Sequence, residues 1–158
     1  MSSIYNSLVG SHLNYGILVW GSAKEYVLKK LQISQNKVVR TMTFTSLRTN
    51  IKKLLRAQKI MNIKELYDFE VSKFMYSMNN EFLPEVFSDY VKPIQHTYST
   101  RHRFRSHYEL ATPKSDTGKS SIKFFGVKLW GSLENDLKDA GSLNKFKELY
   151  KTNLFEND

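Results

Sequence analysis

A strong helical period between residues 63 and 78 constrains the fold of this chain more than any other feature. Apolar residues recur there at steps of four, four, three and four, which places them on one face of an α-helix. They are Ile63, Tyr67, Val71, Phe74 and Met78. Asn62 and Glu65, just ahead of the pattern, have the spacing of a capping box. The sequence therefore predicts a helix that begins near residue 63.

Weaker patterns predict further helices on both sides of this one. Ile4, Leu8, Tyr15 and Val19 have roughly helical spacing and predict a helix over residues 3–18. Three more are expected: one that begins near residue 23 behind the capping pair Ser22 and Glu25, one over residues 49–58, and a terminal one with Ser142 as its N-cap.

Prolines, serines and threonines interrupt any period from Pro84 to about Ser120, which predicts a long connection with one or two short extended pieces. After it, "SSIKFF" is interpreted as a strand and "GVKLWGSL" as a short helix. The predicted fold is mainly α. A helical bundle covers residues 1–83, and the connection covers residues 84–120. A small C-terminal module with a short extended segment and helices covers residues 121–158.

Positive charge is concentrated in two stretches. The sequence has a net charge of +9 and no cysteine, which favours polyanionic partners and an intracellular location, in the cytoplasm or the nucleus. Residues 24–64 hold eleven Lys or Arg against one acid, and residues 101–123 hold six against two. Residues 65–100 are acidic, with two basic residues against six acids. A polyanion-binding face requires such a local excess.

The helix expected from about residue 23 to 42 separates apolar from cationic side chains. At about 100° per residue, one side carries Val27, Leu31, Val38, Val39 and Met42, and the other carries Lys29, Lys30, Lys37 and Arg40. Lys52, Lys53 and Arg56 follow on the next expected helix. We predict that these seven basic side chains contact nucleic acid.

The stretch "HTYSTRHRFRSH", residues 96–107, has three interpretations. A metal site on His96, His102 and His107 is disfavoured because interleaved arginines repel a cation and no carboxylate is at hand. A solvated loop and a nucleic-acid-binding strip remain, and so does a structural role in which Arg101 hydrogen-bonds carbonyls that hold the connection to the C-terminal module. In the strip, the phosphate contacts come from Arg101, Arg103 and Arg105, and the stacking from Tyr98 or Phe104.

No motif predicts catalysis. The "TGKSS" segment, residues 117–121, matches the end of a phosphate-binding loop, but Pro113 stands where the first glycine belongs. There is no G-x-S-x-G elbow, and the acids lie singly along helices rather than gathered for two-metal chemistry. No run of 18 apolar residues predicts a membrane span. We expect no enzyme activity, cofactor, metal, small-molecule substrate or membrane partner for this chain.

Six motifs occur in an order that resembles a known family. They are "IYNSLVGSHLNYGILVWGSA", "LQISQNKVVRTM", "YDFEVSKFMYSMNNEFLPEVF", "HTYSTR", "GKSSIKFFGVKLWGSL" and "LNKFKELYKTNL". Together, over about residues 4–155, they resemble the C-terminal region of non-LTR (LINE-type, Jockey-like) retrotransposon reverse transcriptases. The anchors are Tyr15, Gly16, Trp20, Gly21, Gln35, Arg40, Pro84, Tyr98, Thr100, Arg101, Gly118, Lys119, Trp130 and Phe146. Gly131 and Glu134 depart from the family's W-N-S-L-P.

The resemblance implies a helical thumb, which in such enzymes packs against the template and primer duplex, followed by a post-thumb segment. The family's Y-x-D-D metal-binding signature is absent, since Phe69 follows Tyr67 and Asp68. The resemblance thus implies a non-catalytic fragment of an RNA-directed DNA polymerase. This fragment binds RNA or an RNA/DNA hybrid, and the polymerase palm is a second partner if it is encoded separately. Two alternatives stay open. One is a protein-interaction module that docks through aromatic surface around Trp20 and Trp130, and the other is an inert relic of the element.

Overall fold

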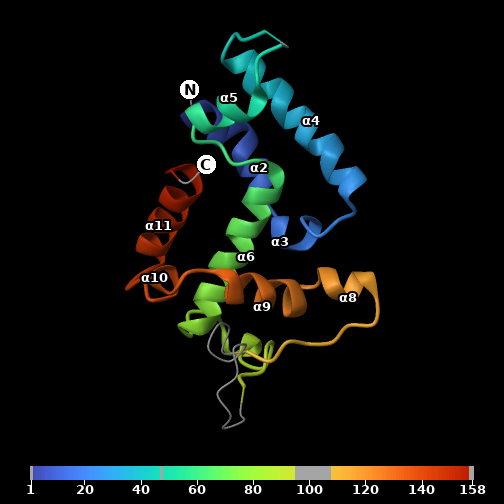
Figure 1. Cartoon of the computed structure of the whole chain (residues 1–158), viewed down its shortest axis with the longest axis vertical. Helices are drawn as coiled ribbons and strands as arrows, with labels where there is room; N and C mark the ends of the chain where they lie inside the picture. The colour runs from blue at the N-terminus through green and yellow to red at the C-terminus, as the bar shows by residue number, and fades with distance from the viewer. Residues whose placement is uncertain (1, 47, 95–107, 157–158) are drawn as a thin grey trace. The chain divides into compact units, whose positions relative to one another are not determined.

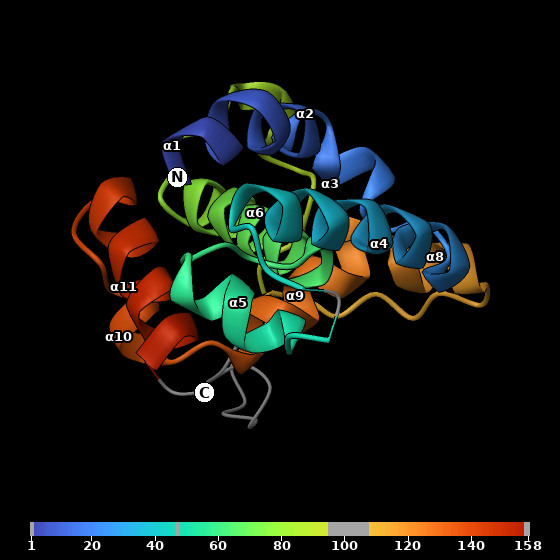
Figure 2. The same cartoon turned by 90° about the horizontal axis from the view of Figure 1, so that it is seen from above.

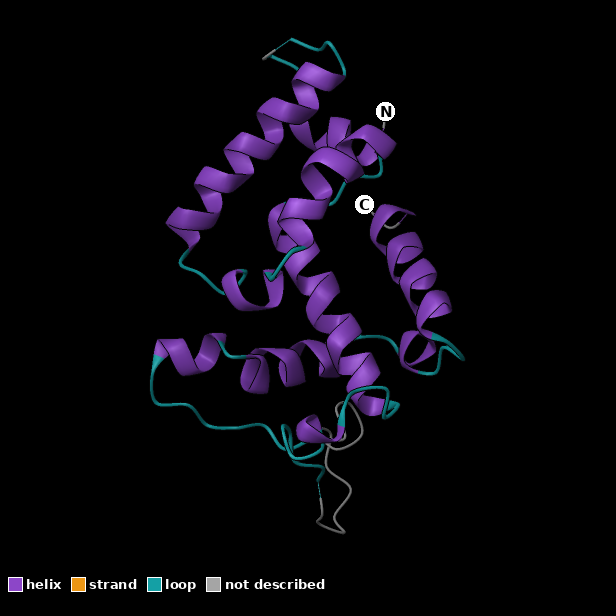
Figure 3. Ribbon diagram, turned by 180° about the vertical axis from the view of Figure 1, so that it is seen from behind, coloured by secondary structure: helices purple, strands orange, loops and turns teal. Residues whose placement is uncertain are grey.

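The computed structural model describes residues 2–46, 48–94 and 108–156, and this part of the chain is mainly helical (Figure 1). Figure 3 shows helices and loops along these residues and no strand. Pro93 and Tyr108 form an isolated antiparallel bridge. The prediction of a mainly α fold is confirmed.

The elements follow one another in the order of their labels. Up to residue 79 they are α1 (Ser2–Tyr5), the π-helix η1 (Asn6–Gly10), α2 (Ser11–Asn14), α3 (Ile17–Trp20), α4 (Glu25–Met42), α5 (Ile51–Ala57) and α6 (Ile63–Asn79). Beyond it they are the 3-10 helix η2 (Glu85–Phe87), α8 (Asp116–Ser120), α9 (Ile122–Ser132), α10 (Asn135–Lys138) and α11 (Leu143–Glu156).

The chain forms two compact units, Met1–Asp68 and Phe69–Asp158, and the division falls inside α6. The boundaries at residues 83–84 and 120–121 stay predictions. The core of the first unit draws on α1, α2, α4, α5 and the start of α6. Its buried members are Tyr5, Leu13, Val39, Leu55, Ile60 and Ile63. Figure 2 shows α5 turning back from the end of α4, and the two helices pack against each other.

The N-terminal segment is helical, as predicted, but it is broken at Gly16. This residue has φ +64°, a left-handed conformation that glycine adopts without steric cost. Just after the break, Trp20 Nε1 donates to the Tyr15 carbonyl at 2.8 Å. The periodic apolar residues of this segment do not face the core: Ile4, Leu8, Tyr15 and Val19 are 58 to 85% exposed.

Three predicted caps have different outcomes. Asn62 and Glu65 form the predicted capping box, because each side chain accepts from the other residue's backbone N–H at 2.9 Å. Ser142 Oγ accepts from the Lys145 amide at the start of α11, which confirms the predicted N-cap. The capping pair Ser22 and Glu25 is wrong: Ser22 Oγ donates back to the Val19 carbonyl, and α4 begins at Glu25 without a side-chain cap.

The second unit packs around buried aromatic rings. Tyr76 stacks on Phe146 with ring centroids 4.7 Å apart, and its hydroxyl donates to the Ala140 carbonyl. Val127 and Trp130, on α9, are almost fully buried. The strand predicted for "SSIKFF" is wrong, since residues 122–125 open α9. Burying two side chains three positions apart on one face requires helical spacing, and this packing overrides the strand preference of Ile and Phe.

Three helices end in the same way, with a non-glycine residue in the left-handed region. Phe44, Lys59 and Glu81 have φ of 52°, 52° and 57°. Each donates its amide three residues back, and the following amide reaches five residues back, as from Thr45 to the Arg40 carbonyl at 3.1 Å. This hydrogen-bond pattern is the Schellman motif, in which glycine usually occupies the left-handed position.

Candidate nucleic-acid interface

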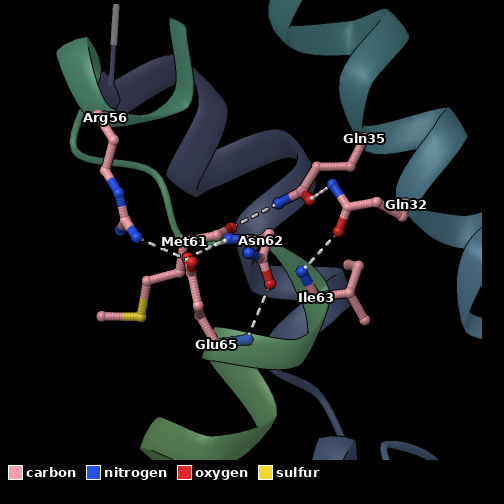
Figure 4. Close-up of polar contacts among 7 residues, drawn as sticks. All are labelled: Gln32, Gln35, Arg56, Met61, Asn62, Ile63 and Glu65. Atoms are coloured by element: carbon pink, nitrogen blue, oxygen red, sulfur yellow. Dashed lines mark hydrogen bonds and ion pairs between the residues drawn. The ribbon is translucent and has the colours of Figure 1, made fainter. Parts of the chain in front are cut away.

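A buried amide network fixes the orientation of α4 in the first unit (Figure 4). Gln35, only 2% exposed, donates to the Met61 carbonyl at 2.8 Å and to the Tyr5 hydroxyl at 2.7 Å. Gln32 accepts from the Ile63 amide at 2.8 Å and donates to Gln35 Oε1 at 2.7 Å. These bonds hold the inner face of α4 against the chain that enters α6, so the opposite face of α4 is turned to solvent.

The outward face of α4 carries three of the predicted contact residues. Lys29, Lys30 and Lys37 are exposed. Tyr26, 64% exposed, and Ile33, 47% exposed, lie among them at helical spacing. Val27, placed by the sequence on the apolar side, is also 43% exposed. The face is therefore both cationic and partly apolar.

Lys52 and Lys53 lie exposed in the first turn of α5, which begins at Ile51 after the N-cap Asn50. Asn50 Oδ1 accepts from the Lys52 amide at 3.0 Å and so fixes the start of the helix. Arg48, also exposed, stands just before it. From Tyr26 to Lys64 the sequence contains ten Lys or Arg and no acid. α4 and α5 thus present exposed lysines in a stretch poor in acids, in which Glu25 opens α4 and Glu65 pairs with Arg56.

Two predicted contact residues have intramolecular partners. Arg40 Nη2 donates to the Thr49 carbonyl at 3.1 Å and ties the end of α4 to the loop before α5. Arg56 Nη2 pairs with Glu65 Oε1 at 3.0 Å, and both side chains are about one-fifth exposed. Their sequence positions predicted phosphate contact, and the geometry gives each a role in holding the first unit together. Their contact with nucleic acid stays a prediction.

The basic strip at residues 96–107 lies outside the described residues. The interpretations of this strip therefore stay predictions. They concern phosphate contacts by Arg101, Arg103 and Arg105, stacking by Tyr98, and the disfavoured metal site on His96, His102 and His107. Downstream of it, the "TGKSS" segment forms the short helix α8, in which Lys119 Nζ pairs with Asp116 Oδ1 at 3.2 Å.

Four described residues that carry the family resemblance are buried and have scaffold roles. Gly21 is buried, and a Cβ there would collide with the Tyr67 ring. Gln35 holds the amide network, and Phe146 and Trp130 are 0% and 1% exposed. The Trp130 ring is itself buried, and docking through aromatic surface around Trp20 and Trp130 stays a prediction. Sequence reasoning missed Gln35 as a network residue, although two glutamines, Gln32 and Gln35, between apolar positions 31 and 39 were a usable signal.

The remaining anchors are mostly on or near the surface. Trp20 is partly buried and packs against the core of the first unit. Tyr15, Pro84 and Lys119 are exposed, and Gly118 is partly buried in α8. A Cβ at Gly118 would meet the Pro113 ring, so glycine permits this close approach. Tyr98, Thr100 and Arg101 lie outside the described residues.

Burial perturbs one carboxyl of the first unit. Asp68, near the middle of α6, has its pKa raised chiefly by burial, with Lys64 acting to lower it and Glu65 to raise it. Within residues 2–46, 48–94 and 108–156, no group of three or more His, Asp or Glu side chains is placed to hold a metal ion. No helix in these ranges combines the length and apolarity needed to cross a bilayer.

Comparison with protein-family models, with curated proteins and with solved structures finds no match for this chain. The assignment of a function therefore rests on the residues and their geometry.

Proposed function

We propose that this chain is a non-catalytic nucleic-acid-binding protein whose first unit contacts the phosphate backbone of RNA or an RNA/DNA hybrid. The observation that carries the proposal is the exposed set on α4 and α5, which is Lys29, Lys30, Lys37, Lys52 and Lys53. Exposed lysines displace the counterions condensed on the phosphates that they meet, and the release of these counterions drives binding.

The amide network supports the same proposal. A backbone-binding face needs cations at fixed positions, and Gln35 and Gln32 fix α4 through bonds to Tyr5, Met61 and Ile63. The order of motifs adds the family context of the proposal, a thumb and post-thumb fragment of a retrotransposon reverse transcriptase that contacts the template and primer duplex.

The test is fluorescence anisotropy with a labelled RNA/DNA hybrid at several salt concentrations. Wild type binds with an affinity that falls linearly with salt on logarithmic axes, because each phosphate contact releases counterions. Reversing Lys29, Lys30 and Lys37 to Glu weakens binding for every sequence and flattens the salt slope.

A matched control reverses three exposed lysines of the second unit, Lys92, Lys128 and Lys145. This variant has the same net charge as the α4 variant. Equal losses in the two variants would show that only total charge matters and would contradict the assignment to α4. Thermal melts of all three proteins establish that the substitutions leave the fold intact.

A second candidate function is a protein-interaction module, favoured by Ile4, Leu8, Tyr15 and Val19. These side chains are exposed, and the first 23 residues contain no Lys, Arg, Asp or Glu. Exposed apolar side chains in an uncharged segment suit a protein partner better than a polyanion. If this candidate function holds, substituting Leu8 and Val19 by Ser removes self-association in sedimentation experiments. The same variant binds the RNA/DNA hybrid like wild type. An inert relic would instead show a broad, noncooperative melt.

A further inference from the structure

Phe44 is the most exposed large apolar side chain of the described residues, at 91%. It follows the C-cap of α4 and has φ +52°. Ending the helix explains the left-handed backbone, and glycine serves that purpose with less strain. The backbone therefore does not account for an aromatic ring at this position, and packing does not either, since the ring is almost fully solvated.

The loop around Phe44 is held in place. The Phe44 amide donates to the Thr41 carbonyl at 3.3 Å, and the hydroxyl groups of Thr43 and Thr45 lie 3.0 Å apart in a hydrogen bond. Arg40 ties the later part of the same loop through the Thr49 carbonyl. The backbone that carries Phe44 is thus held by hydrogen bonds at the end of α4, and Figure 1 shows the connection that leads from there to α5.

The surroundings of this ring are cationic in sequence on both sides. Lys37 and Arg40 precede it on the last two turns of α4, and Arg48, Lys52 and Lys53 follow it. An aromatic ring in a positively charged surface suits a partner that offers both phosphates and flat apolar faces, which is a nucleic acid with unpaired bases. A continuous duplex hides those faces inside its stack.

We propose that Phe44 stacks on an unpaired base, so that the first unit binds single-stranded nucleic acid more tightly than a blunt duplex. This inference rests on the proposed function, because the lysines of α4 and α5 supply the phosphate contacts. It adds the class of nucleic acid that the first unit prefers.

The experiment compares a labelled single-stranded RNA with a blunt RNA/DNA hybrid of the same sequence, using the full chain. Phe44→Ala weakens single-strand binding by about tenfold, within the range for loss of one base–aromatic stack, and leaves the blunt duplex unchanged. Phe44→Trp retains single-strand binding, and its added indole fluorescence is quenched when RNA binds. Tyr15→Ala is the matched control, since this 85% exposed aromatic side chain lies in the uncharged segment, and it changes neither affinity.

Each contrary outcome has its own meaning. If Phe44→Ala binds both probes like wild type, or loses affinity for both equally, the stacking role is overturned. Salt-dependent binding by the lysines stands in either case. Absence of salt-dependent binding in the wild type overturns the proposed function and this inference together. Phe44→Ala keeps the Cβ and the backbone strain of wild type, so a changed melting temperature is not expected.

Discussion

Gln35 donates a hydrogen bond to the Tyr5 hydroxyl at 2.7 Å across thirty residues of sequence. The same amide group donates to the Met61 carbonyl, so one side chain joins three segments of the first unit. Burial raises the pKa of Tyr5, and the bond from Gln35 acts in the opposite direction. The orientation of the exposed lysines of α4 depends on this inward anchor.

Replacing Gln35 by Ala is expected to destabilise the first unit by about 2 to 4 kcal/mol. The substitution leaves the buried Met61 carbonyl and Tyr5 hydroxyl without their donor, and each such loss costs about 1 to 3 kcal/mol. Urea denaturation measures the change in the free energy of unfolding. Ser34→Ala is the control on the same helix, because Ser34 is exposed and its hydroxyl donates to the Lys30 carbonyl one turn earlier. Equal stability of both variants would contradict the role assigned to the network.

Gly21→Ala is expected to destabilise the first unit by about 1 to 3 kcal/mol, the usual cost of overpacking. The new methyl group collides with the Tyr67 ring and lies 2.5 Å from the Ile17 carbonyl oxygen, so backbone and ring must both shift. Gly141→Ala provides the comparison, since nothing lies within 4 Å of a Cβ there. A thermal melt distinguishes the two variants, and a wild-type melting temperature for Gly21→Ala would refute the close packing.

Glycine at the left-handed helix ends is expected to stabilise the protein. Lys59→Gly and Glu81→Gly each relieve a Cβ clash that costs about 1 to 2 kcal/mol, partly offset by the larger entropy of glycine in the unfolded chain. We expect a net gain of up to about 1 kcal/mol in the free energy of unfolding for each. Gln58→Gly, one residue earlier at φ −91°, should lose stability instead. A loss in both Lys59→Gly and Glu81→Gly would contradict the relief of strain.

Asp68→Asn is expected to change how stability depends on pH. Because burial raises the pKa of Asp68 in the folded protein, its charged form is disfavoured there relative to the unfolded chain. Wild type carries this penalty above the raised pKa and loses it as the pH falls through that value. The neutral asparagine lacks the penalty, so we expect the variant to have a larger free energy of unfolding than wild type at neutral pH. This difference shrinks as the pH falls. Denaturation curves at several pH values test this, and an advantage that grows with acidity would contradict it.

Local signals in the sequence predicted the elements whose cause is local. The period of Ile63, Tyr67 and Val71 located α6, and the pairing of Asn62 with Glu65 located its start to the residue. Ser142 did the same for α11. Capping and helical spacing involve residues within one or two turns, so the information lies in a short stretch of sequence.

The sequence could not choose which face of the N-terminal segment is buried. Ile4 and Leu8 satisfy a helical period, yet Tyr5 and Leu13 enter the core. Tyr5 is held there by Gln35, and the break at Gly16 changes the direction of the chain before Ile17. Both causes depend on residues or backbone geometry outside the local period.

The sequence by itself determined the helical class, the start of α6 and the excess of positive charge between residues 24 and 64. The tertiary structure decided which cations are free to act: Lys29, Lys30 and Lys37 face solvent, whereas Arg56 pairs with Glu65 and Arg40 binds the Thr49 carbonyl. It also turned "SSIKFF" from an expected strand into the start of α9. Charge and period are properties of the local chain, but the partner of a side chain is set by residues brought close only when the core packs.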